Sequence, residues 1–239
     1  MSGRGDVLVA LTGVEKGYHS LRPLRLKALE LRAGETVALL GLDQAGAEVL
    51  VNLIAGATLP DTGEVWALGQ PTSAIDTGDA WLSALDGFGI ISERALLLEQ
   101  LTAGQNLAVP LSLELHDLPA PIRAQVAGLA AEVGLDRQRL STFTSELTPL
   151  ERMRLRLGRA VAIGPRVVMA EHPNASLPVG ERPAFAADLS RVASARGLAL
   201  LVLTADPVFA AAVADRVLVL SPATGEITQA ARGWRRWLS

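Results

Sequence analysis

Short apolar runs and longer amphipathic stretches follow one another along the chain. Runs with alternating or continuous apolar residues, separated by glycines and polar turns, predict strands. In the first part of the sequence these runs cover residues 7–13, 24–31, 36–40, 63–69 and 87–91. One helix is expected among them, from residue 48 to residue 54, and it ends at Gly56.

The pattern changes after residue 91, where leucine-rich segments predict helices up to about residue 163. Two later runs, 166–170 and 198–203, are continuously apolar, as is typical of parallel strands covered on both faces. Further helices are expected at 181–195 and 207–214, with another strand at 216–220. This order predicts an α/β fold with a mainly parallel sheet.

Composition narrows the function classes. The 239 residues carry a net charge of -3, so no basic surface for nucleic acid is expected. Cysteine is absent, which excludes disulfides and thiol chemistry. No apolar signal core is visible at the N-terminus, and the apolar runs are shorter than the roughly 20 residues of a membrane span. We therefore expect a chain that is soluble by itself.

Residues 36–50 have the outline of a phosphate-binding loop, since a buried strand leads to Gly41 and Gly46 follows five positions later. In the motif G-x-x-x-x-G-K-[ST] a lysine and a hydroxyl residue come next. Here those positions hold Ala47 and Glu48, and Asp43 adds a second carboxylate. We expect Glu48, in the first helical turn, to satisfy the helix dipole internally.

Ala47 and Glu48, in place of the lysine and the hydroxyl residue, should weaken nucleotide binding strongly through electrostatics. A charge pair about 4 Å apart, at an effective dielectric constant of about 20, contributes roughly 4 kcal/mol. Because about 1.4 kcal/mol changes affinity tenfold, even half of that effect moves micromolar nucleotide binding towards the millimolar range.

The helix expected to begin at residue 149 is capped by side chains of its own first turn. Thr148 is expected as the N-cap, Pro149 as the first helical residue, and Glu151 as the residue that reaches back in a capping box. Such a helix end has no free amides to offer an external phosphate.

Several segments, taken in order, resemble the ATP-binding cassette (ABC) ATPase family, in particular its lipoprotein-release and macrolide-export branch. Tyr18 lies where that family stacks an aromatic ring on adenine. Residues 101–111 resemble its "LT-x-x-EN-x-x-PL" segment, 165–177 its "LLLDEPTSALD" motif, and 214–220 the strand after its switch histidine. The resemblance implies one nucleotide-binding domain over 1–239, with a core at about 1–90 and 164–239, an antiparallel β subdomain and an inserted helical subdomain at about 91–163.

The resemblance also assigns the family's functional positions, and almost all hold other residue types. Glu171 corresponds to the magnesium-positioning aspartate, His172 to the catalytic glutamate, Glu93, within one position, to the magnesium-contacting glutamine, and Ala205 to the switch histidine. The signature "LSGGQ" is replaced by Leu147, Thr148, Pro149, Leu150 and Glu151. Nucleotide-site positions are therefore Tyr18, Gly41, Gly46, Ala47 and Glu48, with no catalytic residue, no metal site, and ATP and magnesium binding weak or absent.

These features predict a catalytically silent ABC-type subunit that acts as scaffold or regulator of a membrane permease complex. Implied partners are a transmembrane permease, docked near residues 96–111, and a second cassette, either another copy or an intact ATPase. The implied location is the cytoplasmic face of the cell membrane. Two alternatives stay open. In the first, the chain is an active ATPase with non-standard residues, or its pocket binds another ligand. In the second, the chain is a soluble adaptor without a membrane partner.

Single residues carry their own alternatives. Tyr18 is either an adenine platform or simply packed, and His172 is either a general base or structural. Glu171 either holds a cation or is structural. Trp234 and Trp237 belong either to a docked C-terminal turn or to a partner or membrane contact.

Overall fold

The computed structural model describes residues 6–18 and 22–230. Within them a six-stranded sheet has the order β10-β9-β3-β8-β7-β6. The central strands are parallel, and only the described edge strand β10 runs antiparallel to its neighbour β9. The strands are β3 (Thr36–Leu40), β6 (Phe88–Ile91), β7 (Val167–Glu171), β8 (Ala199–Leu203), β9 (Arg216–Ser221) and β10 (Glu226–Gln229).

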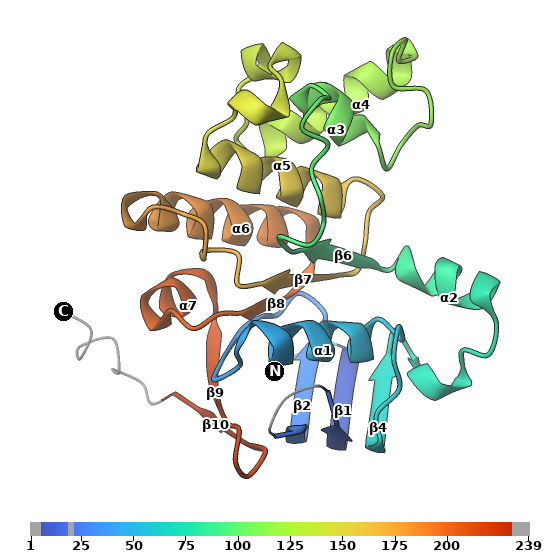
Figure 1. Ribbon diagram of the computed structural model, residues 1–239, viewed down its shortest axis with the longest axis vertical. Helices are drawn as coiled ribbons and strands as arrows, with labels where there is room; N and C mark the ends of the chain where they lie inside the picture. The colour runs from blue at the N-terminus through green and yellow to red at the C-terminus, as the bar shows by residue number, and fades with distance from the viewer. Residues whose placement is uncertain (1–5, 19–21, 231–239) are drawn as a thin grey trace.

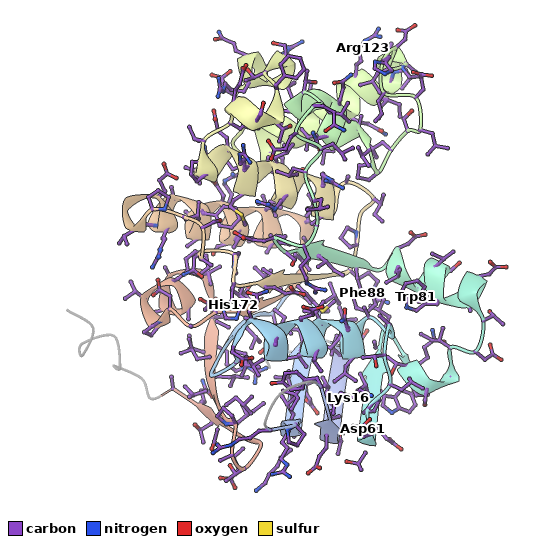
Figure 2. All side chains as sticks on the ribbon, viewed as in Figure 1. Lys16, Asp61, Trp81, Phe88, Arg123 and His172 are labelled. Carbon is purple, nitrogen blue, oxygen red and sulfur yellow. The ribbon has the colours of Figure 1, made fainter. Side chains whose placement is uncertain are left out.

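A second sheet of the described residues has four strands in the order β2-β1-β4-β5, all antiparallel. These strands are β1 (Val7–Lys16), β2 (Leu24–Arg32), β4 (Thr62–Ala67) and β5 (Gln70–Pro71). An exposed ion pair between Lys16 and Asp61, 2.8 Å long, joins the end of β1 to the loop before β4 (Figure 2).

Helix α1 lies between the two sheets, while the other long helices stack on the opposite side of the parallel sheet (Figure 1). Helices α3, α4 and α5 form the end of the molecule farthest from the antiparallel sheet. The described helices are α1 (Gln44–Ile54), α2 (Gly78–Leu85), α3 (Ala103–Ala108), α4 (Ala120–Glu132), α5 (Pro149–Val161), α6 (Arg182–Arg196) and α7 (Pro207–Val213).

The parallel strands separate two hydrophobic clusters, which explains their continuously apolar sequence. In β7, Val167 and Met169 join the cluster around α1, and Val168 and Ala170 join the cluster under α5 and α6. Because successive side chains of a strand point to opposite faces, a strand covered on both faces must be apolar throughout. The predicted α/β class with a mainly parallel core is confirmed.

Some element bounds differ from the prediction. Helix α1 begins at Gln44, four residues earlier than expected, because Asp43 caps it. Helix α2 was not expected; none of its residues is fully buried, and Trp81 and Leu85 are partly buried on one side of it. The predicted division near residues 90 and 164 stays a prediction, and Trp234 and Trp237 lie outside the described residues. Within the described ranges, no helix has both the length and the apolar content needed to span a membrane.

Candidate functional site

The carboxyl ends of parallel strands meet at one edge of the sheet, and ligands of open α/β sheets bind there. Strand β3 leads into the loop before α1, β6 leads into residues 92–94, and β7 ends at Glu171. The topology therefore brings three of the predicted nucleotide segments to one place. We call this place the edge site, formed by Asp43, Glu48, Ser92, Arg94 and Glu171.

The loop before α1 contains a carboxylate, that of Asp43, which hydrogen-bonds to the start of the helix. Asp43 is the N-cap of α1, and its Oδ1 accepts a hydrogen bond of 2.7 Å from the amide of Gly46. Gly41 has φ of 101°, and a Cβ atom there would collide with the carbonyl oxygen of Leu220, so this position requires glycine. Only Leu42 and Asp43 separate Gly41 from the helix, so Gly46 lies in the first turn of α1 and its amide is engaged by the Asp43 carboxylate.

Ala47 and Glu48, at the positions of the missing lysine and hydroxyl residue, both lie in α1. Ala47 is fully buried and packs in the cluster around α1. Glu48 was expected in the first helical turn, where it would satisfy the helix dipole, but that expectation is wrong: the first turn has no acidic residue, because α1 starts at Gln44. Asp43 therefore serves the helix start, and Glu48 is available for another contact.

That contact is Arg94, which bridges two carboxylates of the edge site. Its Nη1 lies 2.8 Å from Glu48 Oε1, and its Nη2 and Nε lie 2.5 and 3.2 Å from the two oxygens of Glu171. The side chain of Glu171 is fully buried, and Ser92 Oγ adds a hydrogen bond of 2.7 Å. A planar guanidinium with several donors suits such a bridge better than an ammonium.

The sequence expectation placed the magnesium-contacting position at Glu93, within one residue. In the structure Glu93 is exposed, and its two neighbours Ser92 and Arg94 make the contacts with Glu171. Sequence reasoning did not identify Arg94. The available signal was a basic residue just after a buried strand whose end meets the edge of the sheet.

His172 lies just beyond the end of β7 (Figure 2). Ala205 lies beyond the end of β8. His172 has φ of 40°, which is strained for this residue type, and its Nε2 is buried without a hydrogen-bond partner. Ala205 is exposed and has no side chain that could contact a phosphate. The adjacent Asp206 is engaged at 2.8 Å with Arg182 and caps α7.

The capping box predicted at α5 is present. Thr148 is the N-cap, Pro149 follows, and Glu151 Oε2 accepts a hydrogen bond of 2.8 Å from the Thr148 amide. Arg139 adds two contacts to Glu151, of 2.7 and 2.9 Å. Leu150 packs against the cluster under α5 and α6. Burial opposes ionisation of Glu151, but the hydrogen bonds from Arg139 and Thr148 outweigh it and lower its pKa.

Tyr18 packs partly buried against the cluster around α1 and lines a cavity of about 410 Å³ with Gly41 and Asp43. The aromatic ring is thus beside the loop before α1. Its use as an adenine platform stays a prediction.

The edge site has three carboxylates and one guanidinium, so its net charge is -2 when all four groups are ionised. No group of three or more potential ligands that could hold a metal occurs among the described residues. The cation that contacts Glu48 and Glu171 in the structure is the guanidinium of Arg94. The groups that a magnesium nucleotide would contact, the Gly46 amide and the Glu171 carboxylate, are already engaged.

The strand order, with a parallel sheet, an antiparallel sheet and a helical end, defines an α/β cassette fold. The sequence pattern of the family described as "ABC transporter" matches residues 24–175. The chain therefore belongs to the ABC transporter family, among its ATP-binding subunits.

Individual relatives agree with this assignment. The chain is 31% identical over 206 residues to the lipoprotein-releasing system ATP-binding protein LolD of Psychrobacter arcticus, covering 86% of this chain and 90% of the relative. It is 31% identical over 216 residues to the sulfate/thiosulfate import ATP-binding protein CysA of Gloeobacter violaceus, covering 89% of this chain and 60% of that relative.

A solved structure confirms the fold. The dimeric bacterial ABC transporter cassette MJ0796 superposes with a TM-score of 0.76 at 21% identity, covering 93% of this chain and 98% of that one. At this identity the likeness establishes the cassette fold alone.

Proposed function

We propose that this chain is a catalytically silent ABC ATP-binding subunit that acts as a scaffold or regulator of a membrane permease complex. The observation that carries the proposal is the Arg94 bridge between Glu48 and Glu171. A fixed guanidinium satisfies the carboxylate that would position a metal ion, so metal binding at Glu171 requires that a charge-assisted contact be broken first.

Two further contacts support the proposal. The Asp43 carboxylate competes with a phosphate for the Gly46 amide, and like charge disfavours a triphosphate beside a site of net charge -2. At the start of α5 the Thr148 and Glu151 side chains use the amides that a partner's phosphate would otherwise contact. Both surfaces that could take part in a shared nucleotide site thus carry built-in anions.

The proposed partners follow from the family. The subunit binds a transmembrane permease and pairs with a second cassette, either another copy or an intact ATPase, at the cytoplasmic face of the membrane. In a pair with an intact ATPase, this chain contributes neither a working phosphate loop nor a working signature. Its role in such a complex is structural or regulatory.

An active ATPase with unusual residues is the second candidate. The observation in its favour is His172, because a strained backbone and an unpartnered Nε2 just beyond Glu171 are features found at functional sites. Against it, no lysine or serine hydroxyl is present at positions 47 and 48 to hold the phosphates and metal.

Measurement of phosphate release by the purified chain with magnesium and ATP separates the two candidates. The proposal predicts no turnover above that of a preparation carrying Glu171→Gln. Turnover that disappears in Glu171→Gln or His172→Ala would contradict the silent-subunit proposal. The permease part is tested separately, by whether a multi-span protein co-purifies with this chain from detergent-solubilised membranes.

A further inference from the structure

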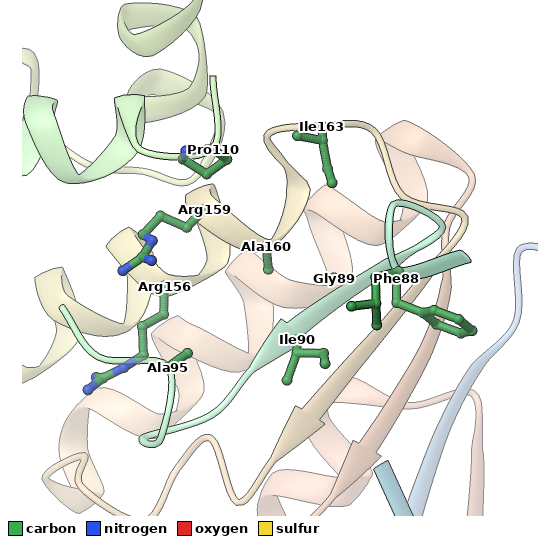
Figure 3. Close-up of a pocket in the computed structure, with 10 residues that line it drawn as sticks. Phe88, Gly89, Ile90, Ala95, Pro110, Arg156, Arg159, Ala160 and Ile163 are labelled. Carbon is green, nitrogen blue, oxygen red and sulfur yellow. The ribbon is translucent and has the colours of Figure 1, made fainter. Parts of the chain in front are cut away.

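A pocket beside α7 is lined by apolar side chains and has a volume of about 530 Å³. Its walls come from the turn before α6, from the start of α6 and from α7, and include Val179, Pro183, Val208 and Phe209. It is distinct from the pocket between β6 and α5 (Figure 3), which includes Pro110 of the segment already expected to dock the permease. We call it the α7 pocket.

Apolar side chains at the mouth of the α7 pocket are exposed. Val179 is 74% exposed and Val208 is 55% exposed, whereas most valines of the described residues are buried. Phe209, in the same pocket, is almost fully buried. A single exposed valine needs no explanation, but two of them around one apolar hollow indicate a surface that another segment covers.

Two charged side chains at the start of α6 give this pocket its polar features. Arg182 donates to Asp206 at 2.8 Å and to the carbonyl oxygen of Leu177 at 3.3 Å, so its planar guanidinium is held in the pocket wall. Glu181, the residue before it, forms no ion pair within the described ranges, and its Oε2 is buried without a hydrogen-bond partner. Buried polar atoms are normally satisfied, so Glu181 lacks a donor.

The chain leaves the described residues close to this pocket. Ala230 donates its amide to the carbonyl oxygen of Val217 at 2.9 Å, and its side chain packs on the cluster that includes Phe209. Residues 231–239 follow. At about 3.5 Å per residue, Trp237 can lie up to about 25 Å from Ala230, which is more than twice the length of about 10 Å that the seven-residue α7 spans.

The composition of residues 231–239 is complementary to the pocket. Trp234 and Trp237 carry large apolar rings, and such a ring stacks favourably on a fixed guanidinium like that of Arg182. The two arginines between them supply donors for the Glu181 carboxylate. Because the segment is tethered to the pocket by a few residues, its effective concentration there is of about millimolar order, and modest contacts suffice to hold it.

We propose that residues 231–239 dock in the α7 pocket of their own chain, with a tryptophan against Val208 and Arg182 and an arginine against Glu181. Of the two alternatives for the tryptophans, this is the docked one, with its seat named. The inference is independent of the silent-subunit proposal, since it concerns the chain by itself. A partner segment of similar chemistry must displace residues 231–239 before it can enter the pocket.

Intramolecular cross-linking of the purified chain tests the proposal. Because the chain has no cysteine, pairs of thiols can be introduced cleanly. Ser239→Cys is combined with Val208→Cys, or with Leu113→Cys as the matched control. Leu113 is fully exposed and lies in the loop between α3 and α4, two helices that lie apart from α7 (Figure 1). A short bismaleimide is added to the dilute protein, and peptide mapping identifies each link.

We expect a link within one chain whose yield with Val208→Cys is about ten times that with Leu113→Cys, because a docked segment stays near the pocket. Exchange of Trp234 and Trp237 for alanine should lower the Val208 link by about tenfold or more, since it removes the aromatic contacts. Circular dichroism and urea unfolding confirm that each variant is folded.

The ionic contact is tested in the same background. Glu181→Lys should lower the yield of the Val208 link severalfold, because it places like charge beside the arginines of the segment. Arg235→Glu together with Arg236→Glu should restore the yield when Glu181→Lys is present. Recovery of this kind is not expected if Glu181→Lys acts only by disturbing the start of α6.

Three results would overturn the inference. The first is an equal yield at Val208 and Leu113, and the second is a Val208 link that is unaffected by loss of the tryptophans. The third is a link that forms only between two chains, which would show that the segment docks on a second copy. None of these results bears on phosphate release, so the silent-subunit proposal would stand in each case.

Discussion

At the scale of single residues, Arg94 has the most informative contacts in the molecule. It takes a position between Glu48 and Glu171 where a divalent ion would otherwise be needed to hold two carboxylates near each other. A guanidinium attached to the chain neither dissociates nor varies with nucleotide. The contacts of Ser92 and Arg94 tie the start of the loop after β6 to Glu48 and Glu171 through side chains of the chain itself.

This account predicts a stability effect for Arg94→Gln. Removal of the guanidinium leaves the fully buried Glu171 without its counter-charge, so the free energy of unfolding should fall by about 2–3 kcal/mol. The matched control is Arg25→Gln, because Arg25 is about as exposed as Arg94 but pairs with the exposed Glu15, so about 0.5 kcal/mol is expected there. Urea unfolding measures the free energy of unfolding of both variants. An equally small loss in the two variants would show that the Arg94 bridge contributes little to stability.

At the scale of elements, helices α1 and α5 are both capped at their N-termini by a carboxylate. The Asp43 carboxylate accepts a hydrogen bond from the Gly46 amide in α1, and the Glu151 carboxylate accepts one from the Thr148 amide at the start of α5. Because a helix N-terminus carries partial positive charge, each carboxylate takes the place that an external anion would fill. The cap of α3, where Gln105 replaces the acid, shows that the fold needs only the hydrogen bonds of such a box and not its charge.

The charge of Glu151 should therefore appear in the pH dependence of stability. Its pKa is lower in the folded chain than in the unfolded chain, so its contribution is complete above the unfolded value of about 4.3 and is lost as the pH falls through the folded value. Glu151→Gln should reduce the free energy of unfolding by about 0.5–1 kcal/mol at pH 7, and the difference should shrink as the pH falls below the pKa of the unfolded chain and through the lower pKa of the folded chain. A difference that persisted at low pH would show that the hydrogen bonds, and not the charge, are responsible.

The same elements show how far the sequence alone leads. The buried strands β3, β7 and β8 were predictable because coverage on both faces requires continuous apolar runs, and the box at Thr148 was predictable because its contacts span three residues. The start of α1 was missed because Gln44 to Gly46 follow a glycine turn and lack an apolar stripe. Arg94 was missed because its partner Glu171 is 77 positions away, and only the packed sheet brings them together.

At the scale of the whole molecule, the cassette fold is intact while its nucleotide-facing groups are engaged internally. Two hydrophobic clusters pack on the two faces of the parallel sheet, and the antiparallel sheet completes the cassette. In the proposed function, outer surfaces of this fold contact the partner subunits. The proposed role as scaffold or regulator requires those surfaces and does not require nucleotide chemistry.

The central claim, that the edge site is closed to nucleotide by its own charges, is tested most directly by equilibrium binding of labelled ATP with magnesium. The wild-type chain is compared with a variant that carries Ala47→Lys, Glu48→Ser and Arg94→Gln, whose folding is checked first because Ala47 is buried. The account predicts no saturation of the wild-type chain below millimolar ATP, and binding at least tenfold tighter in the variant. Saturable, magnesium-dependent binding of ATP by the wild-type chain in the micromolar range would contradict it.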